Sequence, residues 1–473
     1  MQLQFQPSLP LNSGIHLDGS FRIREPRLCT NHTHHYAGYL DFANDTRHTF
    51  FWLFESELDP PNDPLVLWLS GGPGCAGTVG LFEELGPCQI DPQDHQKVRP
   101  RTHAWNKRAN LLFIDQPSNT GFSYRTPAPF NDPNAQPVGT STEAALDLIS
   151  FLQAFYHRFP QYRDSPLHLF GESYAGHYLP ILAQHILTLN QRQPIPYRDY
   201  IRLPFVKPHD HLRSQIFPIR LASIGIGNGL LDFLTQIPSY YTMACKAPLQ
   251  PHSEPPSPSG PTTLFTPAQC ADLAAHTPVC LRALESCHQS RDLHRCRQAK
   301  RYCAHFSFRY TNHTTIYDVR AAARPVPVDY KGYLNRPDVQ AELGVHRSYT
   351  DCNDEVYRDF ERRGDWAGRE PLQALGSLLE MGLPILMYTG DADFICNWLG
   401  TLAVAQAAQW SGQAGFEAQT WRPWSPQDHV QGHIRSFRHF TYLKISEAGH
   451  EVPAYQPAAS LAMLNTWLQK QQL

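Results

Sequence analysis

The ten residues LHLFGESYAG (167–176) join a strand-like pattern directly to a helical one. The run LHLF is short and largely apolar, which is typical of a buried strand, and the residues from Tyr174 to Leu189 have helical spacing. A chain that passes straight from a strand into a helix must turn sharply, here at Ser173, and Gly171 and Ala175 are small enough to allow that turn. A serine in a chance loop would match the bare pattern too. The place between a strand and a helix favours a serine held on a strained turn, with its hydroxyl available as a nucleophile.

Short apolar runs recur along the chain, and each ends at small or turn-forming residues. Because they do not alternate strictly between apolar and polar residues, they suit strands buried on both faces of a mostly parallel sheet. Helical patterns lie between them, and Thr140 with Glu143 forms a capping box at the start of one. This alternation and the serine turn predict an α/β fold of the α/β-hydrolase type, with a mostly parallel central sheet and flanking helices. The runs are Leu65–Leu69, Leu111–Asp115, Leu167–Phe170, Leu221–Gly225, Ile385–Tyr388 and Tyr442–Ser446.

An acid and a histidine follow later strands in the order that this fold requires, which is nucleophile, acid and then histidine. GDADF (390–394) follows one run, and AGHE (448–451) follows the last. The chain has 24 histidines, so it is the place after the last strand that singles out His450. The first loop offers two acids, Asp391 and Asp393, and its position alone leaves both open.

The chain has eleven cysteines, and six of them fall between Cys245 and Cys303, a stretch also dense in proline. Such crowding predicts a local disulfide framework formed in an oxidising compartment. Scattered buried thiols are the alternative, whereas zinc is disfavoured because no Cys-x-x-Cys pair occurs. We interpret residues 230–330 as a disulfide-rich cap. It separates residues 1–229, an N-terminal arm and the first part of the core, from residues 331–473, the second part of the core.

The composition is that of a globular protein, with 41% hydrophobic and 18% charged residues. The net charge of −3 argues against nucleic acid as the main partner, which would favour a basic surface. The many histidines would make the chain strongly cationic in acid. No run of 18 apolar residues occurs, so we expect no membrane span. Residues 1–35 look like an irregular arm. The stretch 190–218 is polar and contains proline, and the stretch 248–267 is low in complexity and looks like a flexible surface loop.

Three Asn-x-Thr sequons, at Asn31, Asn44 and Asn312, fit a secreted glycoprotein. The first residues, MQLQFQPSLPLNSG (1–14), lack the apolar core of a secretory signal. Because the cysteines point to an oxidising compartment, we expect a secreted or vacuolar protein whose leader is missing from this sequence.

Eight motifs in order resemble the serine carboxypeptidases, nearest the fungal secreted branch. The resemblance runs from about Tyr36 to Pro457 and implies an α/β-hydrolase exopeptidase that removes C-terminal residues from peptides in acid. The details nearest the fungal branch are Cys88 in GPC and Glu451 after the histidine. The motifs are WLSGGPGC (68–75), LFEELGP (81–87), LFIDQPSNTGFSY (112–124), GESYAGHYLP (171–180), YLNRPDVQAELGV (333–345), CNDEV (352–356), GDADFICNWLG (390–400) and AGHEVP (448–453).

The resemblance implies a role for each matching residue. Ser173 is the expected nucleophile, His450 the general base and then acid, and Asp393 the residue that orients His450, with Asp391 structural. The backbone N–H groups of Gly72 and Tyr174 form the expected oxyanion hole. A second group is expected to bind the substrate's C-terminal carboxylate, namely Trp68, Ser70, Gly71, Glu84 and Glu172. Two carboxyl groups held together do not both ionise easily, so one of Glu84 and Glu172 would keep its proton and could donate a hydrogen bond to the substrate.

Two residues expected at the substrate site, Ser70 and Glu451, depart from other family members. Ser70 stands where the family has Asn, and a hydroxyl offers one donor where an amide offers two. Weaker carboxylate recognition is therefore expected. Glu451 stands where others carry an apolar residue, and a carboxylate in the pocket should favour Lys or Arg in the substrate.

The family arrangement also implies the disulfides Cys280–Cys303 and Cys287–Cys296, and Cys75–Cys352 as the bridge from the Gly-rich loop to CNDEV. Cys29–Cys88 and Cys245–Cys270 are assigned largely by elimination, and Cys396 is the expected free thiol. Neither a cofactor nor a metal is implied, and the sequence does not indicate the oligomeric state. Two alternatives stay open: an acyltransferase or esterase on the same scaffold, and a catalytically silent secreted binding protein.

Overall fold

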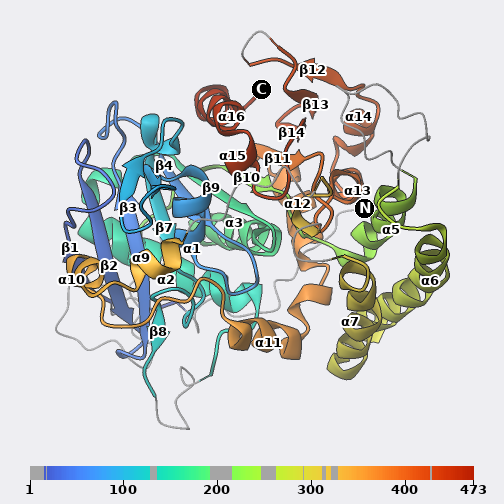
Figure 1. The fold of residues 1–473 in the computed structure, drawn as a ribbon, viewed down its shortest axis with the longest axis horizontal. Coiled ribbons are helices and arrows are strands. Elements are labelled where there is room, and N and C mark those ends of the chain that lie inside the picture. The colour runs from blue at the N-terminus through green and yellow to red at the C-terminus, as the bar shows by residue number, and fades with distance from the viewer. Residues whose placement is uncertain are drawn as a thin grey trace.

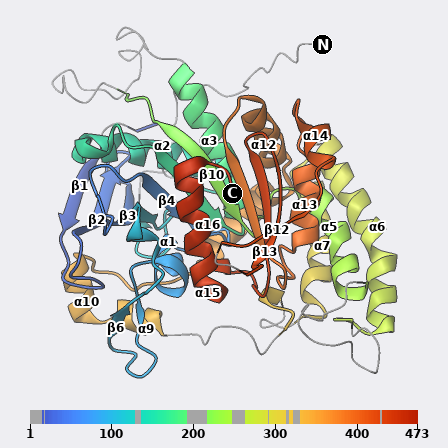
Figure 2. The same ribbon diagram turned by 90° about the horizontal axis from the view of Figure 1, so that it is seen from above.

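A twelve-stranded mixed sheet runs through the computed structural model, with helices on both of its faces (Figures 1 and 2). The structure describes residues 15–16, 19–127, 136–191, 216–246, 263–290, 292–311, 316–320, 329–426 and 429–473. Much of the stretches 190–218 and 248–267 lies outside these residues. Along the described parts of the chain, no helix has the length and apolar character needed to cross a membrane.

All six apolar runs form neighbouring parallel strands in the centre of the sheet. Their order is β7–β4–β9–β10–β11–β14, so segments from both halves of the chain share one core. Nearly every side chain in them is buried, as expected for strands covered on both faces. Their bounds are β4 Leu65–Leu69, β7 Asn110–Ile114, β9 Leu167–Glu172, β10 Leu221–Gly227, β11 Ile385–Gly390 and β14 Phe440–Ile445.

Antiparallel strands extend the sheet at both ends. One end carries β1 (Ser20–Arg24), β2 (His35–Phe42) and β3 (Arg47–Phe54), and β8 (Tyr124–Arg125) pairs with β3. The other end carries β12 (Arg422–Trp424) and β13 (Gly432–Phe437). The expectation of an irregular arm over residues 1–35 is therefore wrong for Ser20–Arg24.

β1 is short and alternates between exposed and half-buried side chains, so its sequence resembles that of a loop. Contacts with distant residues hold it in the sheet: the Phe21 ring packs edge-on against Phe51, and the Arg22 guanidinium forms two hydrogen bonds to Asp41.

Helices flank the sheet. α2 (Ser141–Arg158) begins where predicted: the Thr140 hydroxyl accepts from the Glu143 N–H at 3.2 Å, while the Glu143 carboxylate accepts from Gly139 rather than Thr140. The predicted helix after Ser173 is α3 (Ala175–Gln191). The longer remaining helices are α11 Asp354–Arg363, α12 Glu370–Glu380, α13 Trp398–Ala407 and α16 Pro457–Lys470. The short elements are α1 Gly77–Val79, η2 Gly80–Leu85, β5 Cys88–Ile90, β6 Val98–Pro100, η3 Trp105–Lys107, η5 Pro160–Tyr162, α9 Tyr330–Leu334, α10 Pro337–Leu343, η6 Asp365–Ala367, α14 Gln413–Glu417 and α15 Val452–Tyr455.

The cysteine-rich segment forms three helices, α5 (Phe233–Cys245), α6 (Pro267–Ser290) and α7 (Leu293–Phe308), which lie together at one side of the molecule (Figures 1 and 2). Disulfides join α5 to α6 and α6 to α7. The five disulfide bonds of the structure are Cys29–Cys88, Cys75–Cys352, Cys245–Cys270, Cys280–Cys303 and Cys287–Cys296, the same pairs that the resemblance and elimination led us to expect. Cys396 is free and buried.

Candidate active site

Ser173 lies on a strained turn directly after β9. Its φ of +62° is in the left-handed region, which a residue with a Cβ adopts only when its surroundings enforce it. Backbone hydrogen bonds on both sides do so: the Ser173 N–H donates to Gly227 at 3.0 Å, and the Ser173 carbonyl accepts from Gly176 and Leu230 at 2.9 Å each. A Cβ at Gly171 would meet the Ala175 Cβ at 2.7 Å, so both small residues that flank the serine are needed.

His450 and Asp393 meet at the same edge of the sheet. His450 Nδ1 lies 2.8 Å from Asp393 Oδ2, which fixes the orientation of the imidazole. Asp393 is fully buried. The rival acid, Asp391, interacts electrostatically with Arg320, Glu447 and Lys444 instead. Of the two acids in the loop, the structure therefore brings Asp393 to His450.

Asn228 is a member of this group that sequence reasoning missed. Its amide nitrogen donates to Asp393 Oδ2 at 2.7 Å, and its amide oxygen accepts from the Gly390 N–H at 3.1 Å. Two backbone N–H groups complete the set, from Ile395 to Oδ1 at 3.1 Å and from Cys396 to Oδ2 at 3.2 Å. A signal was available, since Asn228 is a polar residue directly after the buried strand β10, next to the strand that carries Ser173.

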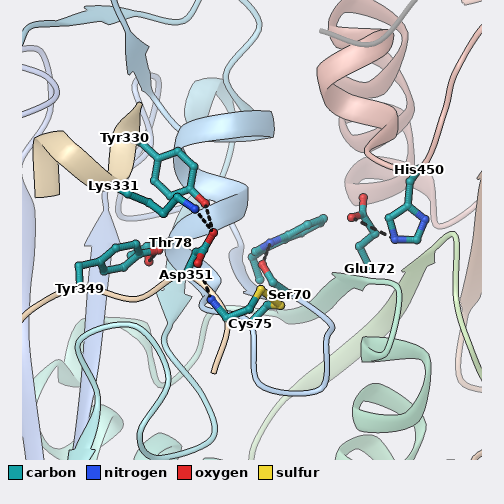
Figure 3. The surroundings of a disulfide bond; sticks show 11 residues. Ser70, Cys75, Thr78, Glu172, Tyr330, Lys331, Tyr349, Asp351 and His450 are labelled. Carbon is teal, nitrogen blue, oxygen red and sulfur yellow. Dashed lines mark hydrogen bonds and ion pairs between the residues drawn. A yellow bond between two sulfur atoms is a disulfide. The ribbon is translucent and has the colours of Figure 1, made fainter. Parts of the chain in front are cut away.

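The Gly-rich loop after β4 packs against the serine turn. A Cβ at Gly71 would lie 2.5 Å from the backbone nitrogen of Tyr174 and 2.6 Å from the Ser173 Cβ, so only glycine allows this close approach. Gly72 next to it has φ +106°. The disulfide Cys75–Cys352 ties the loop to the segment before α11, and Figure 3 shows it with Ser70, between Asp351 on one side and Glu172 with His450 on the other. The loop thus lies close enough to Ser173 for its backbone N–H groups to donate hydrogen bonds to a substrate there.

Two carboxyl groups meet beside the triad. Glu172 ends β9, Glu84 comes from η2, and both side chains are buried within hydrogen-bonding reach of one another. Burial is the main cause that raises both pKa values. It raises the pKa of Glu84 to about 8 with a contribution from the charge of Glu451, while the hydrogen bond with Glu172 acts in the opposite direction. The charges of Glu84 and Glu451 add to burial in raising the pKa of Glu172 well above its usual value. Glu172 Oε1 also lies 3.9 Å from His450 Nε2 (Figure 3). Protons on this pair are therefore retained well above the range usual for glutamate.

Trp68 and Ser70 lie near this pair and are buried as well. The Trp68 indole N–H donates to the Ser70 hydroxyl at 3.3 Å. A Cβ at Gly80, at the start of the helix that carries Glu84, would lie 2.1 Å from the Trp68 indole nitrogen. Strand β4, which carries Trp68, and η2, which carries Glu84, are therefore tightly packed against one another.

Tyr388 is another neighbour of Glu172 that sequence reasoning missed, and Gly227 lies between the two in the sheet. Glu172, Gly227 and Tyr388 lie side by side on β9, β10 and β11. A Cβ at Gly227 would meet the Tyr388 hydroxyl at 2.6 Å, so the tyrosine ring lies over the glycine, and the charges of Glu172 and Glu84 raise the pKa of the Tyr388 phenol beyond the effect of burial. The sequence signal was weak, since Gly227 is one of two glycines in a mostly apolar strand.

The Cys396 side chain lies beside Ser173. Its thiol lies within hydrogen-bonding reach of the serine side chain, and burial raises the thiol pKa well above its usual value, so it stays a neutral neighbour of the triad. Ligand atoms of Asp393, Cys396 and His450 lie within 4.8 Å of one another, as a metal site would need. The hydrogen bonds between Asp393 and its partners already use the Oδ2 atom of that set, which fits proton transfer better than metal binding.

The other expected sites lie at the surface or outside the described residues. The side chains of Asn31 and Asn44 are exposed, as a glycosylated asparagine must be. Asn312 lies outside the described residues. Glu451 is half-buried at the start of α15 (Val452–Tyr455), near enough to Glu84 and Glu172 to raise the pKa of both.

Comparison with known proteins supports the same class of enzyme. Residues 26–470 match the family model for serine carboxypeptidases. Carboxypeptidase Y of Schizosaccharomyces pombe is 39% identical over 442 residues, which are 92% of this chain and 41% of that protein. Carboxypeptidase Y of Candida albicans is 36% identical over 443 residues, 92% of this chain and 73% of that protein.

A solved structure shares the fold. The prohormone-processing carboxypeptidase Kex1 of Saccharomyces cerevisiae superimposes with a TM-score of 0.72 at 22% identity, over 93% of this chain and 92% of that one. The predicted α/β-hydrolase fold is thereby confirmed. The chain belongs to the serine carboxypeptidase family and is a serine-type carboxypeptidase.

Proposed function

We propose that this carboxypeptidase releases C-terminal residues from peptides in acid by an acyl-enzyme mechanism, with Ser173, His450 and Asp393 as its triad. The observation that carries the proposal is the 2.8 Å hydrogen bond between His450 and Asp393 at the sheet edge where Ser173 stands on its strained turn. A nucleophile, a base and a group that orients the base are the parts that the chemistry needs.

In the proposed cycle, His450 takes the proton of the Ser173 hydroxyl as its oxygen attacks the scissile carbonyl. The backbone N–H groups of Gly72 and Tyr174 stabilise the tetrahedral oxyanion. His450 then gives the proton to the departing amine, so the C-terminal amino acid leaves and Ser173 keeps the acyl group. A water molecule, deprotonated by His450, hydrolyses the ester and restores the serine.

The pair Glu84 and Glu172 supplies the exopeptidase specificity in this proposal. A protonated carboxyl group donates a hydrogen bond to the substrate's C-terminal carboxylate, and Trp68, Ser70 and Gly71 line the same site. The raised pKa of the pair supports this role, because a proton is kept where ordinary glutamates have lost theirs. As the pH rises the pair ionises and repels the substrate, so binding is favoured in acid.

Glu451 gives a preference for Lys or Arg at or before the C-terminus. Its charge already acts on Glu84 and Glu172, which supports a place in the substrate pocket. The test is a panel of blocked dipeptides that differ only in Arg or Phe. Glu451→Met should lower the Arg/Phe ratio of kcat/KM, and Glu447→Gln, which removes a half-exposed carboxylate from the same loop, should leave the ratio unchanged. An unaltered ratio in Glu451→Met would contradict the assignment.

The main experiment measures amino-acid release from an N-blocked dipeptide at about pH 4.5, near the usual pKa of glutamate. Wild-type protein should release the amino acid, and Ser173→Ala should lower kcat by about 10⁵ or more. An ester turned over without peptide cleavage would favour the esterase or acyltransferase that the Ser70 replacement keeps open. No turnover of either compound would favour a silent binding protein.

We further propose that the protein works in an oxidising compartment, secreted or vacuolar. The five disulfides and the exposed sequons at Asn31 and Asn44 support this. Protein from its own cell should lose mass on treatment with an N-glycosidase, and Asn31→Gln with Asn44→Gln should remove most of that loss. Reduced cysteines or unchanged mass would contradict this placement.

A further inference from the structure

The residue after the nucleophile is anchored from outside its own segment. The Tyr174 side chain is buried, and its hydroxyl donates to Asp365 Oδ2 at 2.8 Å. Asp365 begins η6, 191 residues further along the chain. The contact is therefore a feature of the folded protein that no local pattern in GESYAG requires.

Asp365 also binds the start of α2. Its Oδ1 accepts from the Ser141 backbone N–H at 2.8 Å, and its Oδ2 accepts from the Ser141 hydroxyl at 2.6 Å. One carboxylate thus receives three hydrogen bonds, two from the first turn of a long helix and one from Tyr174. Burial raises the pKa of Asp365, and the hydrogen bonds from Ser141 and Tyr174 act against that rise. Three hydrogen bonds to one buried carboxyl group restrict its position, so this anchor resists movement.

The Tyr174 ring is held on its faces as well. His177, one turn further along α3, stacks on it with ring centres 4.4 Å apart and planes 8° apart. Phe360 of α11 meets the ring edge-on at 5.9 Å. Burial lowers the pKa of His177 to about 4, so the stacked imidazole is neutral, and its Nδ1 lies 3.8 Å from Asp365 Oδ2. These contacts therefore restrict rotation of the tyrosine side chain.

We propose that Asp365 is a positioning residue for the oxyanion hole: by holding the Tyr174 side chain, it fixes the backbone N–H of Tyr174 toward the reacting carbonyl. This rests on the role proposed above for that N–H group. The argument is geometric. The peptide plane that carries the N–H is set by the strained Ser173 on one side and by the Cα of Tyr174 on the other. An anchored side chain fixes that Cα, and an oxyanion donor is effective only within a narrow range of positions.

Two variants loosen the anchor and leave the N–H group in the chain. Tyr174→Phe removes only the hydroxyl, and Asp365→Asn replaces one of the two carboxyl oxygens that accept the three hydrogen bonds with an amide group that donates. Tyr162→Phe is the matched control, because the Tyr162 hydroxyl also donates to a carboxylate, Glu55 Oε1 at 3.2 Å. Tyr162 precedes β9 whereas Tyr174 follows it, so about 17 Å of strand separates the two.

Three quantities are measured: kcat and KM for a blocked dipeptide, and the affinity of a peptide boronic acid. The concentration of active sites, by which kcat is calculated, comes from titration with an organophosphorus reagent. We expect kcat to fall about 3- to 10-fold in Tyr174→Phe and about 10-fold or more in Asp365→Asn, part of the loss that deleting an oxyanion donor causes. KM should stay the same, and boronic acid affinity should fall in parallel because its tetrahedral adduct uses the same N–H. Tyr162→Phe should change none of these.

A purely structural role for the anchor predicts a different result. Tyr174→Phe would then lower the melting temperature or the titrated fraction, while kcat per titrated site and boronic acid affinity stay at wild-type values, and that would overturn the proposal. Failure of the proposed function is distinguishable, because Ser173→Ala would then keep its activity and the wild type would not react with the organophosphorus reagent.

Discussion

Two buried carboxyl groups near the catalytic edge of the sheet, those of Asp393 and Glu172, have opposite surroundings. Asp393 receives hydrogen bonds from Asn228 and from two backbone N–H groups in addition to His450. Glu172 is almost as well buried, yet its Oε2 makes no hydrogen bond to any described residue, and the acids Glu84, Glu451 and Asp393 all raise its pKa. The fold surrounds one acid with donors that stabilise a negative charge, and it surrounds the other with negative charge that favours a proton.

The difference separates chemistry from recognition. A carboxyl group that several donors hold in one orientation can in turn hold His450 in place, as a triad requires. A carboxyl group that keeps its proton can donate to a substrate carboxylate, as C-terminal recognition requires. The two tasks sit close together, since Glu172 lies 3.9 Å from the triad histidine. The following predictions test whether the two acids really differ in this way.

The largest effect should come from removing the charge of Asp393. Asp393→Asn should lower kcat by about 10⁴, because an amide cannot hold the imidazole in the required tautomer. Single-turnover kinetics on a blocked dipeptide measure this loss. Asp391→Asn is the matched control in the same loop and should stay within a few-fold of wild type. Equal losses in the two variants would contradict the assignment of Asp393.

Asn228 should matter for the same acid, with a smaller effect. Asn228→Ala removes one hydrogen bond to the charged Asp393, which is about 1.5–3 kcal/mol or roughly 10- to 100-fold in kcat. Steady-state kinetics with the same dipeptide should show the loss in kcat and an unchanged KM. A loss confined to KM would place Asn228 in substrate binding instead.

The carboxyl pair should make the protein less stable as the pH rises. Its raised pKa means that the native state binds more protons than the unfolded state above the usual pKa of 4.5, so the free energy of unfolding falls with rising pH. Glu172→Gln removes one such group and should lessen that slope by at most about 1.4 kcal/mol per pH unit, the effect of one bound proton. Urea unfolding at several pH values measures it.

The buried histidines act in the opposite direction, since burial lowers the pKa of His35, His168 and His177 to about 4. They are common to both proteins and cancel in the comparison of wild type with Glu172→Gln. Glu285→Gln, on the exposed face of α6, is the control and should keep the wild-type slope. Identical slopes in wild type and Glu172→Gln would show that the pair does not hold extra protons.

The smallest effect concerns Ser70. Ser70→Asn adds a second donor beside the pair, so KM for substrates with a free C-terminal carboxylate should fall roughly 3- to 10-fold, the worth of about one hydrogen bond. The KM of the matching C-terminal amide should change little. An unchanged or higher KM for the free acid would mean that the serine already suffices.

The central strands were predictable because buried parallel strands are local apolar runs. Local sequence also indicated Ser173, directly after β9, and the loops after β11 and β14 that carry Asp393 and His450, whereas the choice of Asp393 over Asp391 came from the family resemblance. β1 and the antiparallel ends were not predictable, because contacts such as Arg22 with Asp41 decide them. Asn228 and Asp365 were missed for the same reason. Their partners, Asp393 and Tyr174, lie 165 and 191 residues away in sequence, and only the folded sheet brings them together.

The most direct test compares a blocked dipeptide with its C-terminal amide over the range from about pH 4.5, the usual pKa of glutamate, to about pH 8, the raised pKa of Glu84. The ratio of the two kcat/KM values isolates recognition of the carboxylate from the chemistry at Ser173, which both compounds share. We predict that the wild type prefers the free acid at low pH and loses this preference as the pH rises, whereas Glu172→Gln shows a preference that does not change with pH. A wild-type ratio that is constant across this range would contradict the central claim.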